Sequence, residues 1–357
     1  MRVVVAMSGG VDSAVACALV VRAGYQAVGV TLHLADLSGV GLGVSRCCSL
    51  EDVESARAVC AQLGVPHYVL NMEDVFRVEV LDLFVEGYLA GRTPSPCVRC
   101  NSRVKFGQLL EAARTLGGEA VASGHYARRV VAASGEAELW RGVDRDKDQS
   151  YFLFELTQTQ LQSLMFPLGE LTKRQVRQIA RELELPVAEK PDSQEVCFVP
   201  PGKTYREVLA ALASDRLPPE GEVVDQEGRV LGRHPGFVNF TVGQRRGLGV
   251  ATGTKLYVVD IIPTQNRVVV GEAPGLAKRH LAVEQVNWLI HPPTTLRALV
   301  QVRSRHSPQQ ATLEVDGESE KVTVTFDQPV VAPTPGQAAV FYCGERVLGG
   351  GYISRAW

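Results

Sequence analysis

The chain has no apolar run that approaches the roughly 18 residues of a membrane span. It also has no internal repeat and no low-complexity tract. Because the first apolar run, residues 2–7, has the character of a core strand, we expect no targeting leader. Apolar residues make up 45% of the chain and charged residues 21%, which is typical of globular proteins. We therefore expect a cytoplasmic protein with no membrane partner.

An excess of basic residues is absent too. The chain has 37 Lys and Arg against 39 Asp and Glu, for a formal net charge of −2. This balance excludes a generally basic nucleic-acid binder, so any contact with RNA must come from local patches. At 357 residues the chain is longer than one hydrophobic core supports, and two or three domains are expected.

The eight cysteines lack the spacing of a structural zinc site. Cys97 and Cys100 form one CxxC, and no second CxxC or HxxxH is present to supply four ligands. In the cytosol such thiols are more often catalytic, metal-bound or buried than joined in disulfides. A zinc half-site, a redox pair and two ordinary loop thiols all remain open for this CxxC.

The residues around the CxxC give two expectations. The prolines at 94 and 96 predict an extended segment that keeps Cys97 out of a helix. Arg99 and a helix beginning near Arg103 would favour the thiolate of Cys100. Of the other six cysteines, three are predicted core residues, namely Cys17, Cys60 and Cys343, and the adjacent Cys47 and Cys48 have no assigned role. The sixth, Cys197, stands far along the chain after Lys190 and Pro191.

A glycine turn, Ser8-Gly9-Gly10-Val11-Asp12-Ser13, stands between two apolar runs, in the order strand, turn, helix. Glycines let the backbone approach a ligand closely, and a helix start favours an anion. The serines add hydroxyl donors, and Asp12 could hold Mg²⁺ or orient a water bound to phosphate. The lysine of the GxxxxGK[ST] loop is absent. The turn instead resembles the PP-loop of ATP pyrophosphatases, which cleave ATP between the α and β phosphates and leave a substrate as its adenylate.

Strand-like and helical runs alternate through the first part of the chain. This alternation predicts an α/β fold with a mostly parallel sheet, covered on both faces, whose ligands bind beyond the carboxyl ends of the strands. The predicted strands are residues 2–7, 27–34, 67–71 and 120–123, and the predicted helices are 12–23, 51–63, 75–90, 103–116 and 173–183.

Short β segments with Gly and Pro turns follow from about residue 215. Residues 222–231, 255–261 and 267–271 predict a small antiparallel β domain, and residues 296–303, 310–315, 321–326 and 338–342 predict a β-barrel. The expected domains are a PP-loop catalytic domain at 1–214, a central β domain at 215–276 and a C-terminal β-barrel at 277–357.

Seven motifs, in order along the whole chain, resemble those of the tRNA-specific 2-thiouridylases, which place sulfur on C2 of the wobble uridine of certain tRNAs. They are residues 6–13; 92–94 with 100–101; 123–126; 146–151; Asp192 and Ser193 with Cys197 and Phe198; 243–249; and 334–337. Together they are far more specific than the PP-loop, which alone indicates only a superfamily.

The resemblance implies a role for each matching residue. Cys100 would be the nucleophile and Cys197 the persulfide carrier, while Ser95, Pro96 and Cys97 would lie against the target base. The ATP site would comprise Ala6, Met7, Ser8, Gly9, Gly10, Val11, Asp12, Ser13, Leu32 and Gly124. Contacts with tRNA would come from Lys147, Asp148, Gln149, Arg303 and Ser304.

The residues themselves suggest further RNA contacts. Arg245 and Arg246 lie in a glycine-rich loop, which suits an approach to phosphate. Thr172 is a predicted N-cap, and the helix after it carries Arg174, Arg177 and Arg181 on one face, either for RNA or as a solvated surface. His125 could act on the nucleotide or cap a turn.

Cys97 is a departure, since many members of the family have Asp at this position. It raises the hypothesis that Cys97, Cys100 and Cys197 ligate three irons of a [4Fe–4S] cluster. The other hypothesis is persulfide and disulfide chemistry between Cys100 and Cys197.

The resemblance implies a tRNA-uridine 2-sulfurtransferase that uses ATP and Mg²⁺. It would adenylate the C2 oxygen of uridine 34 and replace that oxygen with persulfide sulfur, giving 2-thiouridine. Its partners would be the anticodon loop of tRNA and a sulfur donor, either a cysteine desulfurase or a relay protein. The alternatives are a PP-loop ligase that amidates an adenylated carbonyl, and a non-catalytic tRNA-binding or sulfur-relay module.

Overall fold

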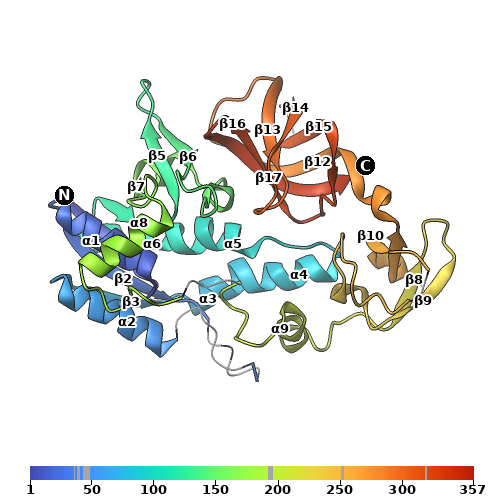
Figure 1. Cartoon of the computed structure of the whole chain (residues 1–357), viewed down its shortest axis with the longest axis horizontal. Helices are drawn as coiled ribbons and strands as arrows, with labels where there is room; N and C mark the ends of the chain where they lie inside the picture. The colour runs from blue at the N-terminus through green and yellow to red at the C-terminus, as the bar shows by residue number, and fades with distance from the viewer. Residues whose placement is uncertain (36, 38–40, 43–48, 192–195, 251–252, 318–319) are drawn as a thin grey trace. The chain divides into compact units, whose positions relative to one another are not determined.

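The computed structural model describes residues 1–35, 37, 41–42, 49–191, 196–250, 253–317 and 320–357 (Figure 1). The chain forms two compact units. The first comprises Met1–Val80, Cys97–Thr204 and Glu345–Leu348, and the second Leu81–Pro96, Tyr205–Gly344 and Gly349–Trp357. The predicted three-domain division, with boundaries after residues 214 and 276, stays a prediction.

A five-stranded parallel sheet organises the first unit and confirms the predicted α/β fold. Its strand order is β3-β2-β1-β4-β7, and each neighbouring pair is parallel. The strands are β1 (Arg2–Ala6), β2 (Gln26–His33), β3 (His67–Asn71), β4 (Ala120–Ala122) and β7 (Leu164–Met165). Val3, Val4 and Val5 are fully buried because helices cover both faces of the sheet, which is why this strand appears as a continuous apolar run.

Three helices cover one face: α1 (Val11–Arg22), α2 (Leu50–Gln62) and α8 (Lys173–Glu182) share one apolar core with Val3 and Val5. Val4 points to the other face, where it and Ala113 of α6 (Phe106–Thr115) both lie beside Gly118. Cys17 and Cys60 are buried in the first core, as predicted.

The helix predicted at residues 75–90 is an unbroken helical run from Glu73 to Leu89. It consists of α3 (Glu73–Phe76), a π-helical segment (Arg77–Asp82) and α4 (Leu83–Leu89). The first unit also contains a hairpin, β5 (Ala127–Val131) and β6 (Ala137–Arg141), and α7 (Gln158–Gln162), which were not predicted. In the second unit α9 spans Tyr205–Leu212.

A four-stranded sheet of order β10-β11-β8-β9 lies in the second unit. Its strands are β8 (Gly221–Val224), β9 (Val230–His234), β10 (Tyr257–Ile262) and β11 (Arg267–Gly271). The prediction of a purely antiparallel domain is wrong, because β8 pairs in parallel with β11. The spacing of short segments did not reveal this, since strand direction depends on the route of the connections.

The C-terminal strands form the predicted barrel, drawn in orange and red in Figure 1. Their order is β12-β15-β14-β13-β16-β17, and β12 closes the barrel by pairing with β17. The strands are β12 (Ala277–Trp288), β13 (Thr295–Gln301), β14 (Gln309–Asp316), β15 (Lys321–Val331), β16 (Ala338–Cys343) and β17 (Arg346–Ala356). Cys343 at the end of β16 is exposed, so its predicted place in the core is wrong.

Within the described ranges, no helix combines the length and the apolar character needed to traverse a lipid bilayer. The cytoplasmic location stays a prediction.

Candidate functional site

The glycine turn joins β1 to α1 at the carboxyl edge of the sheet. Ser13 Oγ accepts a hydrogen bond from the backbone N–H of Ser8 (3.1 Å) and donates to the carbonyl of Gly10 (3.0 Å). The N-cap of α1 is Gly10, which has no side chain to cap the helix, so the first N–H groups of α1 are oriented toward an anion-binding position. Gly9 has φ +71°, and a Cβ there would lie 2.3 Å from the carbonyl oxygen of Asp52, so this position requires glycine.

Two other predicted ATP-site residues lie beside this turn. A Cβ on Gly124 would lie 2.7 Å from the carbonyl carbon of Asp12 and 2.8 Å from the nitrogen of Ser13. The connection after β4 therefore passes directly against the start of α1. Leu32 lies in β2 two residues beyond Val30, which pairs with Ala6, and so is at the same edge of the sheet.

Lys173 is a site residue that the sequence analysis missed. Its Nζ lies 2.7 and 2.9 Å from the two carboxylate oxygens of Asp12, and its side chain is only 13% exposed. It is the first residue of α8, which Thr172 caps as predicted, in a capping box with Gln175. The lysine absent from the turn is thus supplied 161 residues away in sequence, and only the N-cap gave a local hint.

The carboxylate of Asp12 also accepts a hydrogen bond from the hydroxyl of Tyr126 (2.8 Å). With Lys173 and Tyr126 on its oxygens, Asp12 does not by itself form a protein-held Mg²⁺ site. The arrangement instead places a cation and the first N–H groups of α1 at one edge of the sheet, which suits a polyphosphate.

The CxxC lies on a helix rather than in an extended segment. α5 (Pro96–Arg99) begins at Pro96 and continues through a π-helical segment (Cys100–Lys105) into α6. The extended prediction is wrong because proline suits the first position of a helix, where its missing N–H costs nothing. The helix start near Arg103 is also wrong, so Cys100 lies in the second helical turn.

Cys197 lies close to this helix. Burial, and then the charge of Cys197, raises the pKa of the Cys97 thiol to about 11, and the charge of Lys105 acts in the opposite direction. Cys97 is half-buried, Cys100 is 4% exposed, and Cys100 and Cys197 are both present as thiols. Arg99 forms an ion pair with Glu155 (3.1 Å). Because this carboxylate neutralises part of the charge of Arg99, less of that charge is available to stabilise the thiolate of Cys100. Within the first unit, Cys197 and Cys97 of the CxxC therefore lie within electrostatic range of each other.

Metal ligation is not apparent among these thiols. No three His, Cys, Asp or Glu side chains are grouped for a metal ion in the part of the chain that the structure describes, which includes Cys97, Cys100 and Cys197. These three residues therefore do not fit the [4Fe–4S] hypothesis. Cys47, Cys48, Asp192 and Ser193 lie outside the described residues.

The residues predicted to contact tRNA lie in different environments. Asp148 accepts hydrogen bonds from the N–H groups of Gly142 and Ser150, and Gln149 accepts one from the N–H of Tyr126. Both side chains thus hold the chain near the nucleotide turn, while Lys147 beside them is half-buried.

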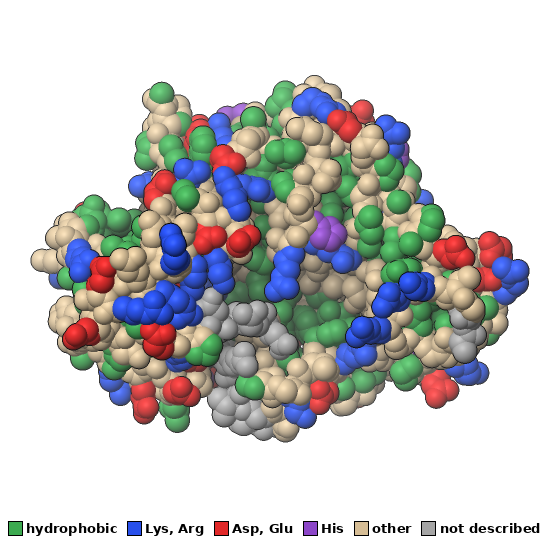
Figure 2. All heavy atoms as spheres, in the orientation of Figure 1, with side chains coloured by type: hydrophobic (Ala, Val, Ile, Leu, Met, Phe, Trp, Pro, Cys, Tyr) green, Lys and Arg blue, Asp and Glu red, His purple; other side chains and the backbone are tan. Residues whose placement is uncertain are grey.

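In the second unit, Arg303 donates to the carbonyls of Val242 (3.1 Å) and Ala332 (2.8 Å), and Ser304 is exposed. Arg245 and Arg246 are exposed on a loop that the Gln244 side chain closes by donating to the carbonyl of Arg246 (2.9 Å). Basic and acidic side chains alternate over the face shown in Figure 2.

The three α8 arginines differ in their contacts, although Arg174 and Arg181 are both exposed. Arg177 donates to the carbonyls of Ala188 (2.8 Å) and Lys190 (3.0 Å), and Arg181 pairs with Glu189 (2.7 Å). Two of the three thus bind the segment that follows α8, whereas Arg174 is exposed.

His125 holds a turn. Its Nδ1 lies 2.9 Å from Ser123 Oγ, and its ring packs against Phe106 and Phe166. Burial, and then the charge of Lys105, lowers the pKa of His125 to about 3, so the ring is neutral at physiological pH. These contacts favour the turn-capping interpretation.

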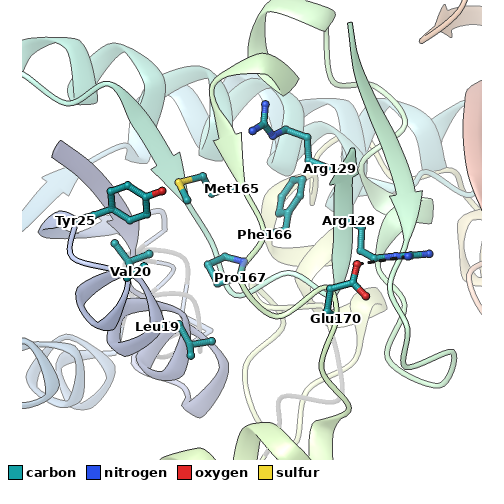
Figure 3. A pocket seen from close by; sticks show the side chains of 10 residues that line it. Leu19, Val20, Tyr25, Arg128, Arg129, Met165, Phe166, Pro167 and Glu170 are labelled. Carbon is teal, nitrogen blue, oxygen red and sulfur yellow. Dashed lines mark hydrogen bonds and ion pairs between the residues drawn. The ribbon is translucent and has the colours of Figure 1, made fainter. Parts of the chain in front are cut away.

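A cavity of about 280 Å³, shown in Figure 3, is lined by Leu19, Val20 and Ala23 near the end of α1 and by Met165 and Phe166. Its α1 residues lie about two helical turns or more beyond Val11, which begins the helix. This cavity is therefore separate from the nucleotide turn.

Comparisons with known proteins cover the whole chain. Family models described as the tRNA methyl transferase HUP domain, the tRNA methyl transferase PRC-barrel domain and the aminomethyltransferase beta-barrel domain match residues 1–201, 210–272 and 278–353. The chain is 48% identical to the tRNA-specific 2-thiouridylase MnmA of Solibacter usitatus, with 98% of each chain covered. It is 50% identical to that of Paramagnetospirillum magneticum, with 99% of this chain and 95% of that one covered.

Solved structures match more distantly. They include an NMN synthetase from Francisella tularensis (19% identity, TM-score 0.36, 60% of this chain and 76% of that one) and a 4-thiouridine synthetase–RNA complex with bound ATP (16%, 0.37, 60% and 51%). At these TM-scores they add nothing to the assignment. The full-length matches at 48–50% identity decide it: the chain belongs to the tRNA-specific 2-thiouridylase family.

Proposed function

We propose that the chain is a tRNA-uridine 2-sulfurtransferase that converts the wobble uridine to 2-thiouridine with ATP and a cysteine persulfide. The observation that carries the proposal is the presence, in one compact unit, of a PP-loop with Lys173 and of the CxxC with Cys197. In this proposal residues 1–214 carry the chemistry, and the predicted domains 215–276 and 277–357 add RNA contacts.

The first step makes the C2 oxygen of uridine a leaving group. The oxygen attacks the α phosphorus of ATP, which enters as its magnesium complex, and pyrophosphate departs. The N–H groups at the start of α1 and the ammonium of Lys173 stabilise the departing charge, because preorganised donors and cations lower the barrier. The residues proposed to hold ATP are Ala6, Met7, Ser8, Gly9, Gly10, Val11, Asp12, Ser13, Leu32 and Gly124.

The second step places sulfur on C2. The outer sulfur of a Cys197 persulfide attacks C2, and the bond from C2 to the adenylate oxygen breaks with release of AMP. The thiolate of Cys100 then attacks the inner sulfur, the S–S bond breaks, and a Cys100–Cys197 disulfide remains. Because its pKa is near 11, Cys97 stays a neutral thiol at physiological pH and does not compete as a nucleophile. No step passes through an iron–sulfur cluster.

The substrate is the anticodon loop, whose wobble nucleotide flips into the site, as is usual when an enzyme modifies a base. We propose that Ser95, Pro96 and Cys97 face that base. Contacts with the rest of the RNA are assigned to Lys147, Asp148, Gln149, Arg245, Arg246, Arg303 and Ser304. A cysteine desulfurase or a sulfur-relay protein loads Cys197 with sulfane sulfur. In each cycle a dithiol reductant first returns the Cys100–Cys197 disulfide to two thiols and is itself oxidised to a disulfide.

Cys197→Ser separates the two steps. We expect the variant to lose 2-thiouridine formation, measured by mass spectrometry of the wobble nucleoside, while it still releases pyrophosphate when tRNA is added. Cys343→Ser, at an exposed cysteine outside the site, is the matched control and should retain both activities.

Equal loss of both steps in Cys197→Ser would mean that Cys197 is structural. Ammonia-dependent product formation without a sulfur donor would favour the ligase, and failure of tRNA to trigger pyrophosphate release would favour a non-catalytic module.

A further inference from the structure

Two sequence motifs to which the mechanism gives no role contact each other in the second unit. One is Arg92-Thr93-Pro94, which precedes the base-facing residues, and the other is the barrel loop Thr334–Gln337. The side-chain amide of Gln337 donates to the carbonyls of Thr93 (2.9 Å) and Pro94 (3.2 Å). The N–H of Thr93 in turn donates to the carbonyl of Pro335 (2.8 Å).

The packing at this contact leaves no room for an additional carbon. Gly336 has φ +89°, and a Cβ there would lie 2.9 Å from the carbonyl oxygen of Thr93 and 3.0 Å from Arg92 Cβ. On the side of the four-stranded sheet, Gly91 has φ +69°, and its Cβ would lie 2.4 Å from Pro263 Cγ. The segment from Gly91 to Pro94 therefore packs closely against both the barrel loop and the turn after β10, and we call this pair of contacts the grip.

The grip ends one residue before the base-facing segment. Only Ser95 separates Pro94 from Pro96, which begins α5, and each residue extends the chain by at most about 3.6 Å. Pro94 and Pro96 both have a fixed φ, which further restricts the movement of this short link. The position of the Pro94 carbonyl therefore constrains where the helix with Cys97 and Cys100 begins.

We infer that the barrel loop Thr334–Gln337 is a positioning element for catalysis, in which Gln337 fixes Thr93 and Pro94 and thereby places Ser95–Cys97 and Cys100 for the target base. The inference rests on the proposed function, because it assigns those residues to the base and the sulfur step. Gln337 is a positioning residue here and does not touch the reacting atoms.

Gly336→Ala tests whether the grip holds the segment at residues 91–94, and Gly344→Ala is its matched control. Both glycines lie in barrel loops with positive φ, but a Cβ on Gly344 would meet nothing within 4 Å. Both variants therefore carry backbone strain, and only Gly336→Ala pushes against Thr93. We expect trypsin to cleave after Arg92 faster in native Gly336→Ala than in the wild type or in Gly344→Ala, at a temperature well below the melting temperature of each protein.

Thiolation kinetics supply the second readout. We expect kcat to fall about 10- to 100-fold in Gly336→Ala and in Gln337→Ala, because a displacement near 1 Å has effects of that size, while the Kd for tRNA stays within about twofold. Gln309→Ala, at an exposed barrel glutamine, should match the wild type.

Each outcome is decisive. Unchanged cleavage after Arg92 and unchanged kcat would overturn the inference. A weaker Kd for tRNA with unchanged kcat would also overturn it, since Gln337 would then act on the RNA directly. Absence of thiolation by the wild type would instead refute the proposed function, and the protease comparison would still show whether the grip exists.

Discussion

The side chain of Lys173 brings a positive charge to a glycine turn that contains no lysine of its own. Its two contacts with Asp12 place the ammonium at the start of α1 before any phosphate arrives. Because the Lys173 side chain is only 13% exposed and its ammonium contacts both carboxylate oxygens of Asp12, the charge is held in a defined position. This is the preorganisation that makes an electrostatic contribution to catalysis large.

Lys173→Met should therefore slow tRNA-dependent pyrophosphate release by about 10²- to 10³-fold, the usual effect of removing one preorganised stabilising group. Lys173→Arg should restore part of the rate. Gln178→Met, at an exposed position of the same helix, controls for the effect of methionine on α8. A rate for Lys173→Met equal to that of the control would show that Lys173 only neutralises Asp12.

His125, in the turn after β4, makes the free energy of unfolding depend on pH in the acid range. The pKa is about 3 in the folded chain and about 6.5 in the unfolded chain, so below pH 6.5 the unfolded state binds the extra proton. Its contribution to stability is thus complete above about pH 6.5 and declines toward pH 3, by at most about 1.4 kcal/mol per pH unit.

When the pH is lowered from 7.5 to 5.5, we expect the melting temperature of His125→Gln to fall less than that of the wild type, as measured by calorimetry. His291→Gln, at an exposed histidine, is the control and should follow the wild type. An equal loss in all three proteins would contradict a buried neutral ring at His125.

At the scale of elements, the sequence predicted the helices and strands whose own residues show a local pattern, such as an apolar run or a capping motif. The buried strand β1 appears as an apolar run, and β3 and β11 have the predicted bounds. Thr172 was recognisable as an N-cap because a cap depends on only four neighbouring residues. The two-residue strand β7 is too short to show any period, and its place in the sheet comes from its partner β4.

In the candidate site, too, the features with a local sequence pattern were predicted, and those that depend on residues far apart in sequence were not. The glycine turn was recognisable because strand, glycines and helix are consecutive, whereas Lys173 and Asp12 meet across 161 residues and leave no local pattern. The helix at the CxxC was missed because proline is read as a helix breaker, although at Pro96 it begins the helix. The family resemblance indicated which residues matter, and only the fold indicates what Gln337 and Lys173 contact.

At the scale of the whole molecule, the net charge of −2 provides no general attraction for RNA. Binding must therefore depend on a few exposed cations, and Arg245 and Arg246 are two that project from one short loop. Each phosphate contact to a single-stranded RNA contributes about 0.7 to the slope of log K against log salt.

Arg245→Glu combined with Arg246→Glu should weaken tRNA binding several-fold at moderate salt and reduce the magnitude of that slope by about 1.4, as measured by filter binding over a salt series. Arg229→Glu combined with Arg233→Glu makes the same change in net charge at exposed arginines that already pair with Asp225 and Glu220. Because total charge changes equally, a local contact predicts a reduced slope only for the first pair. Similar slopes for both double variants would assign the effect to the field of the whole protein and remove the Gly243–Gly249 loop from the RNA interface.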